Sequence, residues 1–184
     1  MSCGAICYFD DLTDAAIRGL WQVLDDADVP SEMLALNYPP HLTLLVCEGF
    51  QRIEEYREVI KPFIQKHEPL LLSFHSLGIF ATDEGVIYLA PLVNRQLLDF
   101  HAELWELTDP FTENENPRYR PEAWVPHITL GYNIPDEKIG DAIEALRKVT
   151  LPQIGILQGL QIGEFIPGAS GFNELFKSRL GSAP

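Results

Sequence analysis

The amino-acid sequence predicts an α+β fold made of two βαβαβ-like halves related by a pseudo-two-fold axis. One observation is a repeated motif: Pro-His-Leu-Thr-Leu at residues 40–44 returns as Pro-His-Ile-Thr-Leu at residues 126–130, 86 residues later. The other is that strand-like and helix-like segments surround both copies in the same order. A repeat of this length is too long for a solenoid and indicates a duplicated lobe.

The first half contains three predicted strands and two predicted helices. An apolar run at 4–8 predicts a buried strand, and apolar residues spaced i, i+3, i+4, i+7 over 17–24 predict an amphipathic helix. A proline-bearing loop, 27–40, then leads to the first motif, whose alternating pattern predicts a strand. A second helical pattern covers 53–63, and a strand-like run covers 70–77.

The second half repeats this order. The predicted strand at 85–89 and the helical stripe at 97–104 correspond to the first two segments. The loop 109–126 delivers the second motif, which is followed by a helical pattern at 139–146 and a strand-like run at 154–166. Each motif is therefore expected at the same point of its lobe.

The two halves, about 4–80 and 85–166, are expected to form a single domain that spans residues 1–184. Residues 82–85, Thr-Asp-Glu-Gly, predict a tight turn between adjoining strands, so no linker separates the halves. The tail, 167–184, contains several glycines and is expected to form a loop, a short helical turn and a frayed end.

Composition and charge narrow the function classes. The 184 residues are 46% hydrophobic, which is normal for a soluble globular protein. The net charge of −14 opposes an extended nucleic-acid surface, but it permits a small nucleotide or an RNA end held by a few local donors. No apolar run has the roughly 18 residues of a membrane helix, and the N-terminus lacks the basic start of a signal peptide. We expect a cytoplasmic monomer that binds no membrane.

The three cysteines do not suggest a metal site. Cys3, Cys7 and Cys47 are odd in number and lack the paired spacing of a zinc site, although Cys3 and Cys47 can meet in space. Cys7 and Cys47 lie in apolar, strand-like runs, where a thiol behaves as a small hydrophobic side chain. We expect buried free thiols, with a thiol nucleophile as the alternative. No metal and no cofactor is expected.

The repeated motif carries the predicted chemistry. Because side chains alternate along a strand, His41 and Thr43 share one face, and so do His127 and Thr129. A pseudo-two-fold axis that joins the strands would place two imidazoles and two hydroxyls around one cleft. Two histidines can act as general base and general acid on a phosphodiester, while hydroxyls donate to its non-bridging oxygens. A duplicated structural strand with polar residues on its exposed face is the alternative.

The paired His-x-Thr segments resemble the two-histidine phosphoesterase superfamily, in particular the group named for 2′-5′ RNA ligase. The resemblance covers nearly the whole chain and is carried by His-Leu-Thr-Leu at 41–44 and His-Ile-Thr-Leu at 127–130. It implies a bilobal fold in which two mostly antiparallel sheets frame a central cleft, with helices on the outside. It also implies hydrolysis of cyclic phosphates, or the joining or cutting of 2′-5′ linkages, without a metal.

By this resemblance His41 and His127 are the catalytic residues and Thr43 and Thr129 bind phosphate. The expected activity is that of a cyclic phosphodiesterase acting on 2′,3′-cyclic phosphate or 2′-5′-linked nucleotides and RNA ends. Either histidine can be the acid, depending on the direction of the reaction. Gly131-Tyr132 follows the second motif where several bacterial members carry a basic residue, which weakens the expectation of ligase-like activity on tRNA-type substrates.

Further substrate contacts are expected in the loops beside the motifs. Arginine can bind a phosphate oxygen in a bidentate manner, and aromatic side chains can stack on a base. Solvated loop arginines, core aromatics and a strand-surface histidine are the alternatives. The candidates are Arg118, Arg120, Tyr38, Tyr119, Trp124 and His75.

Two other function classes remain open at this point. A metal-dependent hydrolase would need ligands scattered along the chain, because the sequence has no His-Glu-x-x-His and no Asp-rich metal motif. A non-catalytic module would use the same cleft to bind a nucleotide or a partner without turnover.

Overall fold

The computed structural model describes residues 2–36, 38–166 and 172–182. The first half contains β1 (Ser2–Phe9), α1 (Asp11–Asp26), α2 (Met33–Leu36), β2 (His41–Cys47), β3 (Gly49–Phe50), α3 (Ile53–Lys66) and β4 (Leu70–Ile79). The second half contains β5 (Ile87–Pro91), α4 (Arg95–Thr108), β6 (Thr112–Glu113), β7 (Ile128–Gly131), α5 (Ile139–Arg147), β8 (Ile154–Phe165) and β9 (Phe172–Arg179). Short 3-10 turns lie at Asp109–Phe111, Pro117–Tyr119 and Asp136–Lys138.

The equivalent helices α1 and α4 begin in the same way. The Asp10 side chain accepts a hydrogen bond from the Thr13 backbone N–H, and the Asn94 side chain accepts one from Leu97 N–H at 2.8 Å. Such N-caps satisfy backbone donors that have no partner within the helix. The predicted apolar stripe of each helix is buried, and both helices are thereby fixed against the sheets.

The strands form one hydrogen-bonded path in the order β2-β1-β8-β4-β5-β7, with β9 paired to β8 and a separate small pair, β3-β6. All of these pairings are antiparallel. The long strand β4 joins two sheets, because Leu70–Ser73 pairs with β8 while the remainder pairs with β5. The predicted α+β architecture with antiparallel sheets is confirmed.

The last strands of the two halves are exchanged. β8 pairs with β1 of the first half, whereas β4 pairs with β5 of the second half. β4 and β8 pair with each other where the two sheets meet, Leu70 with Leu157 and Ser73 with Ile154. Residues 70–73 of β4 and 154–157 of β8 thus occupy equivalent places on the two sides of this pairing. The pseudo-two-fold axis therefore passes through this pairing. The sequence halves 4–80 and 85–166 are units of repetition, but each sheet is built from both of them.

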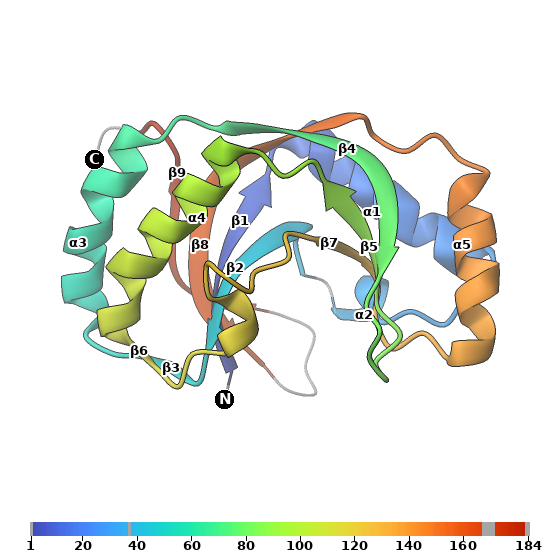
Figure 1. Cartoon of the computed structure of the whole chain (residues 1–184), viewed down its shortest axis with the longest axis horizontal. Coiled ribbons are helices and arrows are strands. Elements are labelled where there is room, and N and C mark those ends of the chain that lie inside the picture. Colours follow the sequence, from blue (N-terminus) through green and yellow to red (C-terminus); the bar gives the residue numbers. More distant parts are fainter. Residues whose placement is uncertain (1, 37, 167–171, 183–184) are drawn as a thin grey trace.

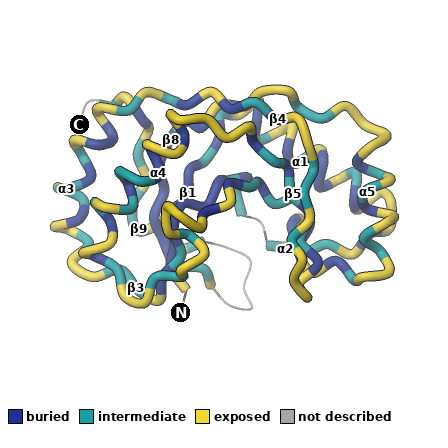
Figure 2. Tube along the Cα trace, in the orientation of Figure 1, coloured by how far each residue is buried: buried dark blue, intermediate teal, exposed yellow. Residues whose placement is uncertain are grey.

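Helices flank the strands on two sides (Figure 1). The pair α3 and α4 lies on the side of β9 and β8, and the pair α1 and α5 lies on the side of β4 and β5. Buried residues concentrate in the central strands and on the inner faces of the helices (Figure 2). The largest fully buried side chains include Trp21, Tyr56, Phe63, Phe74 and Phe100. None of the helices in the described part of the chain is long and apolar enough to cross a membrane.

The C-terminal tail departs from its prediction. Part of it, residues 172–179, forms strand β9, which pairs with β8 from Phe165↔Phe172 to Gly159↔Arg179. The predicted loop and helical turn are wrong for this segment, while residues 167–171 and the end of the tail, 183–184, lie outside the described part. The glycines around the segment suggested a loop, but pairing to an existing strand edge supplies backbone hydrogen bonds that glycine content does not reveal.

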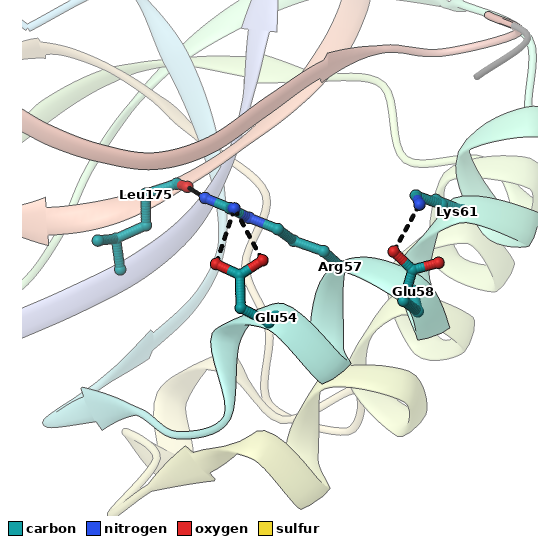
Figure 3. Close-up of polar contacts among 5 residues, drawn as sticks. All are labelled: Glu54, Arg57, Glu58, Lys61 and Leu175. Atoms are coloured by element: carbon teal, nitrogen blue, oxygen red, sulfur yellow. Dashed lines mark hydrogen bonds and ion pairs between the residues drawn. The ribbon is translucent and has the colours of Figure 1, made fainter.

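Helix α3 is tied to the new strand by Arg57. Its guanidinium donates to the Leu175 backbone carbonyl and forms an ion pair with Glu54 at 2.9 Å, while Lys61 pairs with Glu58 one turn further along the helix (Figure 3). A carbonyl of β9 thus receives a side-chain donor from the neighbouring helix. This contact joins α3 to β9 two residues before Lys177.

Candidate active site

The four motif residues line one pocket of about 560 Å³. His41 and Thr43 come from β2, Thr129 comes from β7, and His127 lies immediately before β7. The remaining wall is largely apolar and aromatic and includes Met33, Leu36, Tyr38, Val46, Phe80, Val86, Tyr119, Trp124, Tyr132 and Phe165. The structure therefore brings the two sequence motifs together, as the pseudo-two-fold axis predicts.

The motif strands are the two ends of the sheet path, and they lie beside each other. No backbone ladder joins β2 to β7 in the described structure. Each strand therefore keeps one edge whose backbone groups need other partners. The pocket lies where these two edges approach, so both His-x-Thr segments can present side chains to the same molecule.

Each motif histidine has one ring nitrogen fixed by a backbone carbonyl. Nδ1 of His41 lies 2.7 Å from the Pro39 oxygen, and Nδ1 of His127 lies 2.8 Å from the Val125 oxygen. A carbonyl only accepts hydrogen bonds, so Nδ1 carries the proton in both rings. Nε2 is then the nitrogen left to accept or donate a proton in the pocket.

Burial lowers the pKa of both histidines below the usual value. For His41 desolvation is the largest cause; the hydrogen bond to Pro39 opposes it, and the nearby charge of His127 lowers the pKa further. For His127 desolvation again dominates and the hydrogen bond to Val125 opposes it. Both imidazoles are therefore held towards the neutral form, in which Nε2 is a base.

Indole N–H groups bind the backbone carbonyls of both motif threonines. Trp124 donates to Thr43 O at 2.9 Å, and Trp21 of α1 donates to Thr129 O at 3.0 Å. Both tryptophans are buried. These bonds satisfy carbonyls of the two strands from opposite halves of the chain.

Trp124 packs as a core side chain. Its ring stacks on His101 at 3.8 Å between centroids with an interplanar angle of 7°, and Nε2 of His101 lies 2.9 Å from the Leu44 oxygen. His101 is also buried, and desolvation lowers its pKa. Trp124 borders the pocket, but its ring face is occupied by His101 on one side, so the core-anchor alternative fits it better than base stacking.

The other sequence candidates divide into two groups. Tyr38, Tyr119 and Arg118 line the pocket, with Arg118 exposed at its rim. Arg120 and His75 do not line it and are exposed. His75 lies on β4 with its side chain at the surface, which matches the alternative of a strand-surface histidine.

Two phenylalanines of the pocket were not predicted. Phe80 directly follows β4, and its ring meets the His127 ring edge-on with 4.8 Å between the ring centroids. Phe165 ends β8, and its ring centroid lies 5.8 Å from that of Tyr38. Both follow or end the last strand of a half, so they are near-equivalent in the repeat. The sequence does show an aromatic residue at the end of the last strand of each half. Whether that side chain enters the pocket depends on the exchange of β4 and β8, which the sequence does not reveal.

The three cysteines are buried free thiols, as predicted. Cys3 and Cys47 face each other across β1 and β2. Burial is the main cause that raises the pKa of Cys47 to about 12, and it raises the pKa of Cys3 as well. These thiols are poor sources of thiolate at neutral pH, which does not fit the alternative of a thiol nucleophile. Among residues 2–36, 38–166 and 172–182, no three His, Cys, Asp or Glu side chains cluster as metal ligands.

Antiparallel sheets joined by a shared strand, with a His-x-Thr segment at each facing edge, define a two-histidine phosphoesterase fold. The chain belongs to the 2′-5′ RNA ligase superfamily, whose family model matches residues 9–158. This match confirms the family that the motifs indicated. Membership supports a phosphoesterase-type function.

Solved structures show the same fold. The protein TT0787 of Thermus thermophilus is 16% identical, with a TM-score of 0.64 over 98% of both chains. Escherichia coli LigT complexed with 3′-AMP is 14% identical, with a TM-score of 0.60 over 97% of this chain and 96% of that one. At these identities the likeness concerns the fold.

A curated relative from Bacillus pumilus carries the name "Putative phosphoesterase". It is 26% identical over 111 residues, which are 59% of this chain and 61% of the relative. The match thus spans about three fifths of the relative's length.

Proposed function

We propose that the protein is a metal-independent phosphodiesterase that hydrolyses 2′,3′-cyclic phosphates or 2′-5′ linkages of small nucleotides or RNA ends. The observation that carries the proposal is that His41, Thr43, His127 and Thr129 line one pocket, with both histidines holding their protons on Nδ1. Each ring therefore offers Nε2 for proton transfer.

In the proposed reaction one neutral histidine removes a proton from water through Nε2 as the water oxygen attacks phosphorus. The other histidine, in its protonated form, donates the Nε2 proton to the ribose oxygen as its bond to phosphorus breaks. The base gains one proton and the acid loses one, so the two histidines end the step with their protonation states exchanged. The carbonyls of Pro39 and Val125 keep both rings in the required orientation throughout.

Thr43 and Thr129 are proposed to donate hydroxyl hydrogen bonds to the non-bridging oxygens of phosphorus. Those oxygens gain charge in the transition state, where a fixed donor is most effective. Neither hydroxyl has a hydrogen-bond partner among the described residues, and so each is free to make this contact. Arg118 at the rim adds a permanent positive charge to the pocket lining.

The substrate proposal rests on the pocket and on the relatives. The aromatic side chains Tyr38, Phe80 and Phe165 can stack on a nucleobase. Solved structures of LigT include complexes with 3′-AMP and with ATP. A small nucleotide or a nucleotide end is the ligand that best fits both observations.

The test uses 2′,3′-cyclic nucleotides and a short RNA with a 2′,3′-cyclic end, with EDTA throughout. The wild type is compared with His41→Ala and His127→Ala, and His75→Ala serves as a matched control because His75 is exposed and outside the pocket. We expect turnover that survives EDTA, is lost in both pocket variants and persists in the control.

Other outcomes identify the other function classes. Turnover abolished by EDTA and restored by a divalent metal would establish a metal-dependent hydrolase. Tight nucleotide binding by folded wild-type protein, without turnover of any of these substrates, would replace the proposal with a binding module.

A further inference from the structure

The cations of this acidic chain are distributed unevenly. The chain has 13 Lys and Arg residues, all within the described part. Eight form ion pairs with a carboxylate, seven of them with one that is three or four residues away in the sequence. Among the described residues, five have no such partner: Arg118, Arg120, Arg147, Lys177 and Arg179. Most of the Lys and Arg side chains are thus neutralised by a nearby carboxylate, and these five are not.

Lys177 and Arg179 lie on the same sheet face as the first motif. Across the sheet, Thr43 pairs with Ile6, Ile6 with Gln161 and Gln161 with Lys177. Directly paired residues of antiparallel strands point to the same face. The row therefore runs from a motif threonine on β2, over β1 and β8, to a lysine on β9.

A parallel row connects His41 to Arg179. His41 pairs with Tyr8, Tyr8 with Gly159 and Gly159 with Arg179. A side chain at Gly159 would collide with the Tyr8 hydroxyl, because a Cβ there would lie 2.3 Å from it. The missing side chain therefore lets the Tyr8 ring extend over β8 towards β9.

The Tyr8 ring links the two cations to the active-site face. Nζ of Lys177 lies 4.6 Å from the ring centroid, a cation-π contact. Burial raises the pKa of the Tyr8 hydroxyl, the charge of Arg179 lowers it and the charge of Glu174 raises it, so both charges lie within electrostatic reach of the ring. Lys177 and Arg179 are both exposed and so are available to a ligand.

We propose that Tyr8, Lys177 and Arg179 form a subsite for a second phosphate group of the substrate, which is the end of a short oligoribonucleotide. The proposal rests on the proposed function of the pocket. Two rows that start at His41 and Thr43 end at two unpaired cations, and an aromatic ring lies between them. A phosphate bound there would meet two charged donors, and the ring of Tyr8 could stack on a base.

The distance between β2 and β9 limits which ligands can reach both the motif residues and the two cations. β2 and β9 are separated by three strand spacings, which is about 14 Å. The second phosphate must therefore be at least one nucleoside away from the reacting one, which excludes a pyrophosphate as the bridging ligand. Glu174 lies on the same strand and accepts a hydrogen bond from Gln161 at 3.0 Å. Its charge also acts on Tyr8 and opposes a phosphate on the Gln161 side of the ring, so the substrate is expected to pass over Lys177 and Arg179.

The experiment compares a 2′,3′-cyclic mononucleotide with a trinucleotide that bears the same cyclic end. Lys177→Gln and Arg179→Gln are each measured beside Arg147→Gln, which removes an unpaired cation from α5, away from the sheet face. We expect the preference of kcat/KM for the trinucleotide to fall about tenfold or more in each β9 variant, the loss expected for one charge-assisted contact. It stays at the wild-type level in the Arg147 variant.

Salt dependence gives a second readout. The slope of log(1/KM) against log[salt] for the trinucleotide should become shallower by about 0.7 for each cation removed from β9. Glu174→Gln should change the preference in the opposite direction, because it removes a negative charge beside the subsite. An equal loss in the Arg147 variant, or no loss in the β9 variants, would overturn the subsite.

Binding separates this inference from the proposed function. A trinucleotide with a 3′-terminal phosphate and the matching mononucleotide are titrated into the same proteins, with no turnover required. Tighter binding of the trinucleotide that is lost in Lys177→Gln and Arg179→Gln supports the subsite even if no substrate is hydrolysed. Equal binding of both ligands by the wild type overturns it even if the cyclic mononucleotide is hydrolysed.

Discussion

Each pocket histidine follows a proline, and the structure explains why. Proline fixes its own φ and restricts the preceding residue to an extended conformation. The carbonyls of Pro39 and Val125, which precede Pro40 and Pro126, are thereby held where Nδ1 of the histidine can donate to them. The repeated prolines, Pro40 and Pro126, thus help to orient the two histidine rings.

The lowered histidine pKa values predict an acidic pH optimum. The profile of kcat/KM rises as the base loses its proton and falls as the acid loses its proton in the free enzyme. Because burial holds the pKa of both His41 and His127 below the usual value of about 6.5, the maximum is expected below pH 6.5. Glu84, which also lines the pocket, has a lowered pKa, caused mainly by a hydrogen bond from Thr82 that favours the ionised carboxylate.

The measurement is kcat/KM for a cyclic mononucleotide between pH 4 and 9, with unfolding monitored at each pH. A maximum above pH 7 would contradict the proposed assignment of acid and base to these two histidines.

The motif strands are edge strands, and a carbonyl of each one accepts a hydrogen bond from a tryptophan far away in the sequence. Trp124 is separated from Thr43 by 81 residues, and Trp21 from Thr129 by 108. Trp124 also lies next to Val125, whose carbonyl orients His127. The Trp124 contact therefore connects the backbone of the first motif to the segment that carries the second.

Replacement of either tryptophan by phenylalanine is expected to impair the reaction more than binding. Trp21→Phe and Trp124→Phe remove the indole N–H and leave a strand carbonyl without a donor, which lets the motif shift. We expect kcat to fall about tenfold or more, because small misplacements of reacting groups are costly, while KM changes much less. Steady-state kinetics on the preferred substrate provide the measurement.

Trp105→Phe is the matched control. Trp105 packs against the core from α4, and its indole has no hydrogen-bond partner among the described residues. It should lose stability without a comparable loss of kcat. If all three variants lose kcat in proportion to their loss of stability, the tryptophans have a structural role only.

Periodicity predicted the long helices α1, α3, α4 and α5 and most strands, since apolar spacing records which face is buried. The four-residue helix α2 was missed, because it lies within the predicted loop 27–40. Strand β9 was missed because its partner edge on β8 is visible only in the fold. The roles of Trp21 and Trp124 were hidden for the same reason, because each acts on a carbonyl far along the chain. The four motif residues were identifiable because the motif occurs twice.

At the level of the whole molecule, duplication predicted the symmetry but not the connections. The sequence period shows that two halves are alike, whereas the exchange of β4 and β8 depends on which edges pair. This exchange ties the halves into one sheet path and brings β2 and β7 together. Each half then contributes one histidine and one threonine to the pocket, which neither half completes alone.

The central claim is that the two halves divide acid and base between His41 and His127. The most direct test measures His41→Ala and His127→Ala on two substrates with the same nucleotide but different leaving groups, a ribose hydroxyl and 4-nitrophenol. A leaving group as stable as 4-nitrophenolate needs no proton from an acid. If the two histidines divide the roles in this way, one variant regains substantial turnover on the nitrophenyl ester while the other stays inactive on both. Equal losses in both variants on both substrates would contradict it.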